Sequence, residues 1–327
     1  MMMLTATGRR WRAAAPYPIP ASAPYNAPAY LVTPTEDGSG STVHPAVLDM
    51  GPNGWRGWRF WMAITGYWQS DDDYENPHIL VSQDGITWQP PAGLVNPVYK
   101  VTGVVFHSDT HLTYDPAADR LWLFFRRFIP GVSFELHRQQ TFRASSPDGV
   151  TWPTSAVELN WQRPDGGGQV VSPAIVRRGP GDWWLFGWYH LTRKLVVYRA
   201  TSPDGQWHGP VPGVGDFAAG DIPWHLDVID DSGVFRAIAD LGPRYLGAAD
   251  GLVAGSSRDG VRWAWSQTHL MDLPAAPAWD SGELYRTTFT RHENGTHFRV
   301  WYSANGPESW RTGYTELPRS LWPEPPT

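Results

Sequence analysis

Four copies of one short turn pattern recur along the chain, at residues 82–88, 146–152, 202–207 and 257–263. Each copy begins with serine, contains an adjacent Asp-Gly pair and ends with tryptophan, and the aspartates lie 64, 56 and 55 residues apart. An Asp-Gly pair supplies a tight turn with one residue at positive φ, while Ser and Asp side chains can bond the free N–H groups of that turn. Self-similarity at a period of about 40–50 residues is typical of β-propellers. We therefore expect each copy to join the last two strands of one propeller blade.

The segments between these turns have the composition of short strands. Three runs of four to eight residues, rich in Val, Ile, Phe, Tyr and Trp, precede each turn. No amphipathic helical pattern of about 12 residues competes with them. The innermost strands are expected at 44–50, 108–114, 172–177 and 225–230, and a fifth unit at 284–291, 297–303 and 312–317.

The fifth unit lacks a fourth strand, because a proline-rich stretch without another turn pattern follows it. An open sheet edge invites aggregation, so we expect the apolar run 29–33 to pair with this sheet and close the ring. The prediction is an all-β fold, a five-bladed β-propeller of four-stranded antiparallel blades whose ring is closed by an N-terminal strand. Residues 1–28 are expected to form an extended Pro-rich arm, 29–318 a single propeller domain and 319–327 a Pro-rich tail.

Composition narrows the classes of partner. The net charge of −6 argues against a nucleic-acid or anionic-membrane surface, and the absence of cysteine excludes disulfides and thiolate metal sites. No apolar run approaches the roughly 18 residues that span a bilayer, and prolines interrupt the segment after the N-terminal arginines. We therefore expect neither membrane insertion nor a signal peptide. Twenty tryptophans exceed what a core of this size needs, so some are expected to serve as platforms for a sugar or a partner protein.

Polar residues recur at the starts of the innermost strands, where propeller ligands usually bind over the central channel. Both a ligand site and a water-filled channel would produce this recurrence, and we favour the ligand site. The predicted ligand-binding residues are His44, His111, Trp224, His225, Asp227, Tyr285 and Arg286, together with Glu75 from the long loop 68–76. The predicted catalytic residues are Asp109 and Glu283.

Two kinds of chemistry are open to these residues. Glycoside hydrolysis ordinarily needs two carboxylates flanking the scissile bond, and Asp109 could pair with Glu283, Asp227 or Glu75. Histidines converging with Asp109 would suit a transition metal, but the chain has no short-spaced ligand signature. We therefore predict no metal and no cofactor.

The turn pattern resembles the Asp-box of sialidases and other carbohydrate-active propellers, in a shortened form. The whole layout is similar to five-bladed family 43 glycoside hydrolases across nearly the entire chain. That resemblance implies an Asp base on blade one, an Asp that modulates pKa on blade two and a Glu acid on blade three. Only Asp109 on blade two matches, because His44 and Ser172 occupy the other two positions.

Blade one also resembles propeller proteins encoded by bacteriophages, in the stretches 44–47, 53–63, 74–79 and 82–85. This resemblance implies a carbohydrate-recognising minor tail protein, located in the virion and made in the host cytoplasm, that contacts host envelope glycan at the cell surface. The Pro-rich arm would then bind other tail proteins. The alternatives are a glycoside hydrolase acting on cell-wall polysaccharide and a purely structural tail-tip protein, so the sequence leaves open whether the protein is an enzyme.

Overall fold

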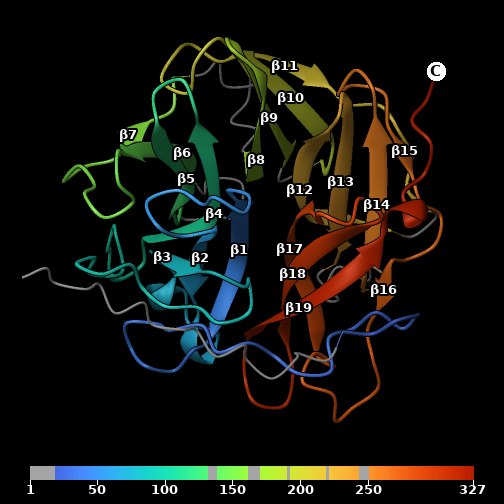
Figure 1. Ribbon diagram of the computed structural model, residues 1–327, viewed down its shortest axis with the longest axis horizontal. Coiled ribbons are helices and arrows are strands. Elements are labelled where there is room, and N and C mark those ends of the chain that lie inside the picture. The colour runs from blue at the N-terminus through green and yellow to red at the C-terminus, as the bar shows by residue number, and fades with distance from the viewer. Residues whose placement is uncertain (1–18, 132–137, 161–169, 190–191, 219–220, 243–249) are drawn as a thin grey trace, which may run out of the picture.

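The structure is a computed structural model that describes residues 19–131, 138–160, 170–189, 192–218, 221–242 and 250–327. Five antiparallel sheets follow one another around a ring, and in Figure 1 the blue first blade meets the red fifth blade. The five-bladed all-β prediction is confirmed. Apart from short 3₁₀ turns, the described ranges contain no helix, and none of their helical segments is long and apolar enough to cross a bilayer.

The strands follow the order of the chain from one blade to the next. Blade one contains β1 (Thr42–Asp49), β2 (Phe60–Gly66) and β3 (Pro77–Ser82). Blade two contains β4 (Phe106–Asp115), β5 (Arg120–Ile129), β6 (Arg138–Ser146) and β7 (Val157–Glu158), and blade three contains β8 (Val170–Gly179), β9 (Asp182–Tyr189), β10 (Leu195–Ala200) and β11 (His208–Pro212). Blade four contains β12 (Pro223–Asp231), β13 (Val234–Leu241), β14 (Gly251–Ser257), β15 (Ala264–Trp265) and β16 (Met271–Asp272), and blade five contains β17 (Glu283–Arg291), β18 (His297–Asn305) and β19 (Arg311–Pro318).

The number of strands differs from four in three of the blades. In blade one the fourth position is a single bridge between Val81 and Gln89, because Pro90 and Pro91 follow and have no N–H to continue a ladder. Blade five has three strands, and in blade four the outer position is divided between β15 and β16, both paired with β14.

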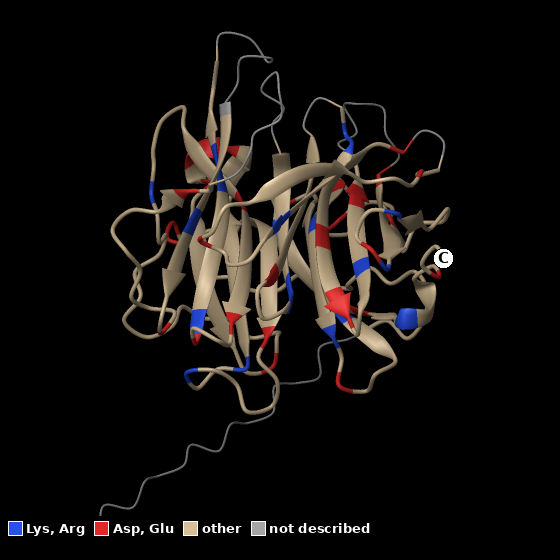
Figure 2. Cartoon of the chain, turned by 90° about the horizontal axis from the view of Figure 1, so that it is seen from above, with Lys and Arg blue, Asp and Glu red and all other residues tan. Residues whose placement is uncertain are grey.

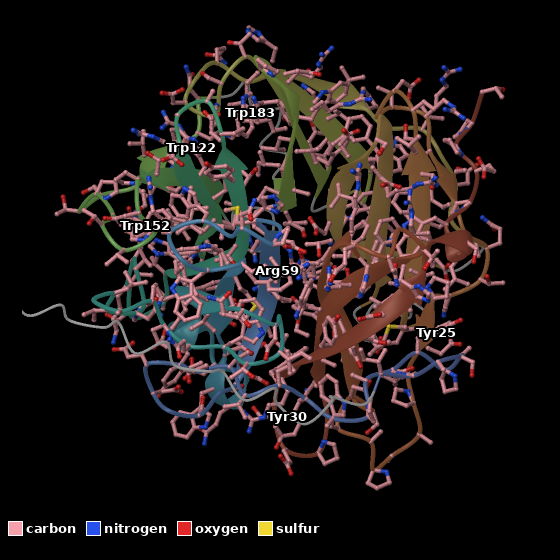
Figure 3. All side chains as sticks on the ribbon, in the orientation of Figure 1. Tyr25, Tyr30, Arg59, Trp122, Trp152 and Trp183 are labelled. Carbon is pink, nitrogen blue, oxygen red and sulfur yellow. The ribbon has the colours of Figure 1, made fainter. Side chains whose placement is uncertain are left out.

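The N-terminal segment lies against the fifth blade, where Figure 3 labels Tyr25 and Tyr30. Tyr30 forms an antiparallel bridge with Gly313 of β19, and the backbone N–H of Leu31 donates to the carbonyl of Thr312 at 2.8 Å. Prolines at 28 and 34 flank this contact and limit the ladder. The expected closing strand is therefore present as one bridge rather than as a full strand.

Aromatic side chains fill the wedges between neighbouring blades. Between blades three and four, for example, Phe186 contacts both Phe235 and Trp263 edge to face, with ring centroids 5.0 and 5.7 Å apart. Most of the tryptophans that the structure describes are buried in this way, and only Trp68 is exposed. Charged residues of both signs are scattered over the strands and loops (Figure 2).

The repeated turns join the last two strands of their blades, as predicted, at 146–152, 202–207 and 257–263. In the second turn the Asp148 carboxylate accepts from the N–H groups of Val150 and Thr151, and Trp152 donates to the Gly149 carbonyl. The first and fourth turns repeat these bonds. The third turn has one residue fewer between its glycine and its tryptophan and does not repeat them.

Candidate functional site

Each of the five inner strands contains an irregularity in register at the same position near its start. The two residues at each irregularity are His44-Pro45, Asp109-Thr110, Ser172-Pro173, Trp224-His225 and Tyr285-Arg286. A β-bulge bends its strand and re-aims side chains, so neighbours on one strand no longer have to point to opposite faces. This explains how adjacent residues such as Tyr285 and Arg286 both reach the axis of the propeller. Most of the predicted site residues belong to these five pairs.

Three of the bulged residues have a left-handed backbone. The φ angles are 58° for His44, 51° for Asp109 and 55° for Ser172, at equivalent positions of blades one to three. A left-handed conformation costs about 1–3 kcal/mol for a residue with a Cβ atom and persists where the surroundings hold it in place. Its recurrence at one position in three blades marks this end of the channel as the candidate functional site.

The centre of the site is a cluster of His44, Asp109 and His225, which come from blades one, two and four. Asp109 Oδ1 lies 3.2 Å from His44 Nε2 and 3.4 Å from His225 Nδ1. All three residues are no more than 1% exposed. The structure thus brings together three residues that the sequence analysis predicted for this site.

The facing atoms of this cluster have no hydrogen-bond partners in the described structure, namely His44 Nε2, Asp109 Oδ1 and both ring nitrogens of His225. The Thr65 hydroxyl donates to the Val43 carbonyl at 3.0 Å, so it accepts from His44 Nδ1 at 2.9 Å. This bond is shorter than the 3.4 Å contact of the Asp109 N–H with the same nitrogen. With the proton on Nδ1, the lone pair of His44 Nε2 is directed at Asp109 Oδ1. Two acceptors that face each other in this way favour a bound cation between them.

Two arginines hold Asp109 in its charged form. Burial alone would raise the pKa of this carboxyl, but Arg126, whose Nε lies 2.7 Å from Asp109 Oδ2, and the more distant Arg286 keep the pKa well below its usual value. The Ser172 N–H also donates to Oδ2 at 3.0 Å. Oδ2 is therefore fully occupied, and Oδ1 is the oxygen that faces the two imidazoles. The sequence analysis did not select Arg126, although a charged residue within the aromatic strand β5 was a usable signal.

Both histidines of the cluster are neutral at physiological pH. Burial lowers the pKa of His44 to about 3 and that of His225 well below its ordinary value, and in both cases this outweighs the attraction of Asp109. The backbone N–H of His225 donates to the buried Asp240 carboxylate on β13, which fixes the start of β12. Neutral imidazole is the form that binds metal ions.

Glu75 and Tyr285 line the same end of the axis. Glu75 follows the 3₁₀ turn η2 (Asp72–Tyr74), is 5% exposed, and places Oε1 3.5 Å from His44 Nδ1. Burial raises the pKa of Glu75 well above its usual range. The Tyr285 ring packs edge to face on His225 at 4.4 Å, and its hydroxyl accepts from Trp224 Nε1 at 3.2 Å. Burial likewise raises the pKa of Tyr285.

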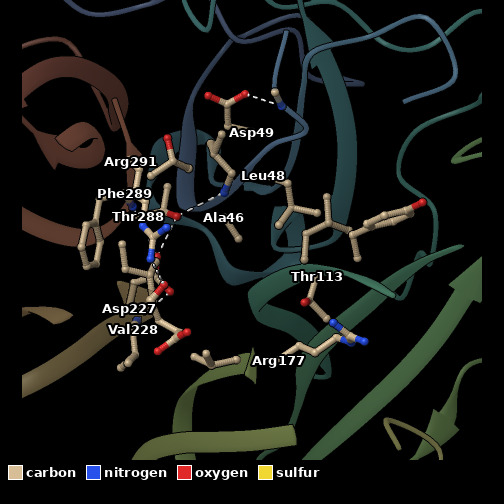
Figure 4. Close-up of a pocket in the computed structure, with 18 of the residues that line it drawn as sticks. Ala46, Leu48, Asp49, Thr113, Arg177, Asp227, Val228, Thr288, Phe289 and Arg291 are labelled. Carbon is tan, nitrogen blue, oxygen red and sulfur yellow. Dashed lines mark hydrogen bonds between the residues drawn. The ribbon is translucent and has the colours of Figure 1, made fainter. Parts of the chain in front are cut away.

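His111 and Asp227 lie deeper along the axis, in a channel of about 700 Å³ that opens at the opposite end of the propeller (Figure 4). His111 Nε2 donates to the Ile175 carbonyl at 3.0 Å, and Asp227 accepts from Thr288 at 2.8 Å. The buried guanidinium of Arg286 separates this pair from the cluster, 4.0 Å from Asp109 Oδ1. These two predicted ligand residues are therefore not part of the cluster.

Glu283, the other predicted catalytic residue, is the first residue of β17 and is partly exposed. Its charge raises the pKa of Tyr285 and Asp240 as a minor contribution, which places it near the same end of the axis. It is not one of the three residues whose ligand atoms converge. Among the residues near the cluster, Glu75 is the second carboxylate that contacts it.

No protein-family model matches the chain. The chain is 26% identical over 314 residues to the A type blood N-acetyl-alpha-D-galactosamine deacetylase of Flavonifractor plautii, an alignment that covers 80% of this chain and 40% of the relative. A crystal structure of an N-acetylgalactosamine deacetylase from F. plautii, in complex with blood group B trisaccharide, superposes with a TM-score of 0.75 at 23% identity and covers 90% of this chain and 97% of that chain.

A thermostable family-43 glycoside hydrolase superposes with a TM-score of 0.58 at 11% identity, covering 88% of this chain and 96% of that chain. These structural likenesses establish the propeller fold. The chain spans well under half of the curated relative's length. None of the three proteins is described as a virion component, so the predicted resemblance to phage tail proteins receives no support from them.

Proposed function

We propose, in place of the metal-free site expected from the sequence, that this protein is a metal-assisted hydrolase that removes the acetyl group from an N-acetylated amino sugar at the end of a glycan. The observation that carries the proposal is the convergence of two neutral imidazoles and one ionised carboxylate, whose facing atoms lack hydrogen-bond partners. The likeness to an N-acetylgalactosamine deacetylase supplies the substrate class. Hydrolysis of the amide consumes one water and gives acetate and a free amine.

The separations within the cluster fit a metal site. Metal–ligand bonds of about 2.0–2.1 Å in tetrahedral geometry place ligand atoms roughly 3.3 Å apart. The two measured separations from Asp109 Oδ1, 3.2 and 3.4 Å, agree with this value. The Thr65 hydroxyl that orients His44 is the kind of outer partner that ligating histidines have. His44, Asp109 and His225 would hold the ion, which leaves further positions for water and substrate.

A bound divalent ion would polarise the amide carbonyl and lower the pKa of a coordinated water. The residues of the chain supply the remaining functions. A bound cation would also favour the ionised form of Glu75, which would then accept the proton of the attacking water and deliver it to the leaving amine. The Tyr285 hydroxyl and the Trp224 indole would contact the sugar, and the burial of the cluster residues would limit access of bulk water.

Glycoside hydrolysis is the second candidate, and one observation favours it. Asp109 and Glu75 are neighbouring carboxyls whose pKa values are shifted in opposite directions, the pattern of a nucleophile and a general acid. Two further hypotheses stay proposals that neither the fold nor the relatives test. One is sugar recognition without turnover, and the other is a place in a virion with host glycan and tail proteins as partners.

The distinguishing experiment measures both products from one reaction. Purified protein is treated with EDTA, reloaded with Zn²⁺, Mn²⁺ or Co²⁺, and incubated with an oligosaccharide that ends in N-acetylgalactosamine. We expect acetate release that depends on the added metal and is lost in His44→Ala and Asp109→Asn, while the exposed control His208→Ala retains it. Reducing sugar released without acetate would favour the glycosidase, and binding without either product would favour recognition alone.

A further inference from the structure

A second hollow lies beside the candidate site, over blades one and five. Its volume is about 430 Å³, and it is lined by Ser39, Ser41, residues 68–70 and residues 306–309 with Arg311. One wall is Trp68, the only exposed tryptophan of the described chain, at 39% exposure. An exposed indole beside hydroxyl and amide side chains is the usual composition of a sugar-binding surface, because the ring stacks on the C–H face of a sugar while polar groups bond its hydroxyls.

A continuous series of aromatic contacts joins this hollow to the His44–Asp109–His225 cluster. Tyr285 packs on His225 and also on Trp310, with centroids 5.0 Å apart, and Trp310 packs on Tyr67 at 5.7 Å. Tyr67 directly precedes Trp68 in the chain. The two sites are therefore at the same end of the propeller with three aromatic residues between them, so that different residues of one oligosaccharide could occupy them.

The backbone beside Trp68 is held in an uncommon conformation. Gln69 and Ser70 are consecutive non-glycine residues with φ of 55° and 58°. Trp310 Nε1 donates to the Ser70 hydroxyl at 2.9 Å, and the Asp71 N–H donates to the Trp68 carbonyl at 3.0 Å. Two left-handed residues in succession cost free energy and persist at sites such as ligand clamps. Here they present the indole and the Gln69 side chain at the edge of the hollow.

The charges around the hollow select against anionic sugars. Glu308 is the carboxylate among the residues that line the hollow. Arg311, the cation in the lining, donates to the Ser39 carbonyl at 2.7 Å and lies over the Tyr30 ring. A carboxylate on a bound sugar would meet the Glu308 carboxylate and an arginine that already donates to the protein. Neutral sugars are the ligands this chemistry accepts.

We propose that the Trp68 hollow is a subsite for the second or third residue of a neutral glycan whose terminal sugar occupies the axial cluster. The proposal rests on the proposed function only in its assignment of the terminal sugar. The ring of Trp68 supplies the stacking surface, and Gln69, Ser70 and Glu308 supply hydrogen bonds to the hydroxyls. The subsite contributes affinity for extended glycans and none for a monosaccharide.

The test compares a monosaccharide, methyl α-N-acetylgalactosaminide, with a neutral trisaccharide carrying the same terminal residue. Affinity is measured by calorimetry and kcat/KM by acetate release, for the wild type, Trp68→Ala, Trp68→Phe and the surface control Val95→Ala, whose valine is 82% exposed. We expect Trp68→Ala to lose at least tenfold on the trisaccharide, about 1.4 kcal/mol, and nothing on the monosaccharide. Trp68→Phe restores most of the loss, and Val95→Ala matches the wild type.

The calorimetric measurement separates failure of this proposal from failure of the proposed function. If no acetate appears but the trisaccharide binds more tightly than the monosaccharide in a Trp68-dependent manner, the subsite stands and the deacetylase does not. Equal losses on both sugars would show that Trp68 acts only by shaping the cluster, and no loss on either would overturn the subsite. Failure of the wild type to bind the trisaccharide, or equal binding of a uronic-acid analogue, would also contradict it.

Discussion

Replacing the aspartate of the second repeated turn by alanine tests whether the turns stabilise the propeller through local hydrogen bonds. The Asp148 carboxylate accepts four of them: from Val150 N at 2.8 Å, Thr151 N at 2.6 Å, Thr151 Oγ1 at 2.8 Å and Ser146 Oγ at 3.0 Å. Alanine leaves two backbone donors without a protein partner. Because water can reach this turn in part, we expect Asp148→Ala to lower the free energy of unfolding by about 1–3 kcal/mol.

The third turn supplies a matched control. Its aspartate, Asp204, has no hydrogen bond to its carboxylate in the described structure, because this turn is one residue shorter. Here the Gly205 N–H donates to the Ser202 carbonyl and Trp207 Nε1 to the Pro203 carbonyl. From the sequence alone, both aspartates would be expected to matter equally. The structure corrects this, and Asp204→Ala is expected to change stability by less than about 0.5 kcal/mol.

The assay is urea unfolding followed by tryptophan fluorescence for the wild type and both variants, repeated between pH 5 and pH 2. The hydrogen bonds of Asp148 lower its pKa from 3.8 to about 2 despite some burial. A depressed pKa in the folded state means that this stabilisation is present above pH 3.8 and is lost as the pH falls toward 2. The difference between wild type and Asp148→Ala should therefore shrink over that range. Equal losses for the two variants at pH 7, or a difference that does not change with pH, would refute the reasoning.

Three further predictions concern packing, closure and the site. Gly149→Ala should lower the free energy of unfolding by more than about 2 kcal/mol, because a Cβ at this position, where φ is 77°, would lie about 2 Å from an indole ring. Gly103→Ala has open space around it and should cost about 1 kcal/mol from its positive φ alone. Thermal unfolding of the two variants compares these costs. Deleting residues 1–35 should lower the melting temperature well below that of a 1–24 deletion, and equal melting would contradict ring closure through 29–33. Arg126→Met should weaken glycan and metal binding at least tenfold, because Asp109 loses its nearest cation and its pKa rises, which favours the neutral carboxyl; unchanged titrations would exclude this role.

The propeller fold was predictable because its signals are local. In the turn 146–152, every bond of the Asp148 side chain joins residues two or three positions apart, so serine, aspartate, glycine and threonine at fixed spacing are sufficient to indicate it. The number of strands per blade was less predictable, because Pro90 and Pro91 shorten an outer strand without changing the turn before it.

Part of the site was also predictable. The recurrence of polar residues at the starts of inner strands selected His44, Asp109 and His225, and the structure places them together because equivalent positions of a ring of repeats converge on its axis. The same reasoning could not separate these residues from His111 and Asp227. Asp109 and His111 are two positions apart in the chain, and the bulge at 109–110 decides that one faces the cluster and the other the opposite channel.

The sequence by itself determined the repeat, its turns and the ring that they imply, since these depend on contacts within a few residues. The tertiary structure decided which atoms meet. Asp109 follows His44 by 65 residues, and its Oδ1 faces two imidazoles because Arg126 and the Ser172 N–H occupy its other oxygen. The Thr65 hydroxyl accepts from His44 Nδ1 and so leaves the lone pair of this histidine on Nε2, and Trp310 donates to Ser70 in the turn that presents Trp68. None of these pairings leaves a local pattern, because each joins side chains whose separation in space is fixed only when the blades close on one another.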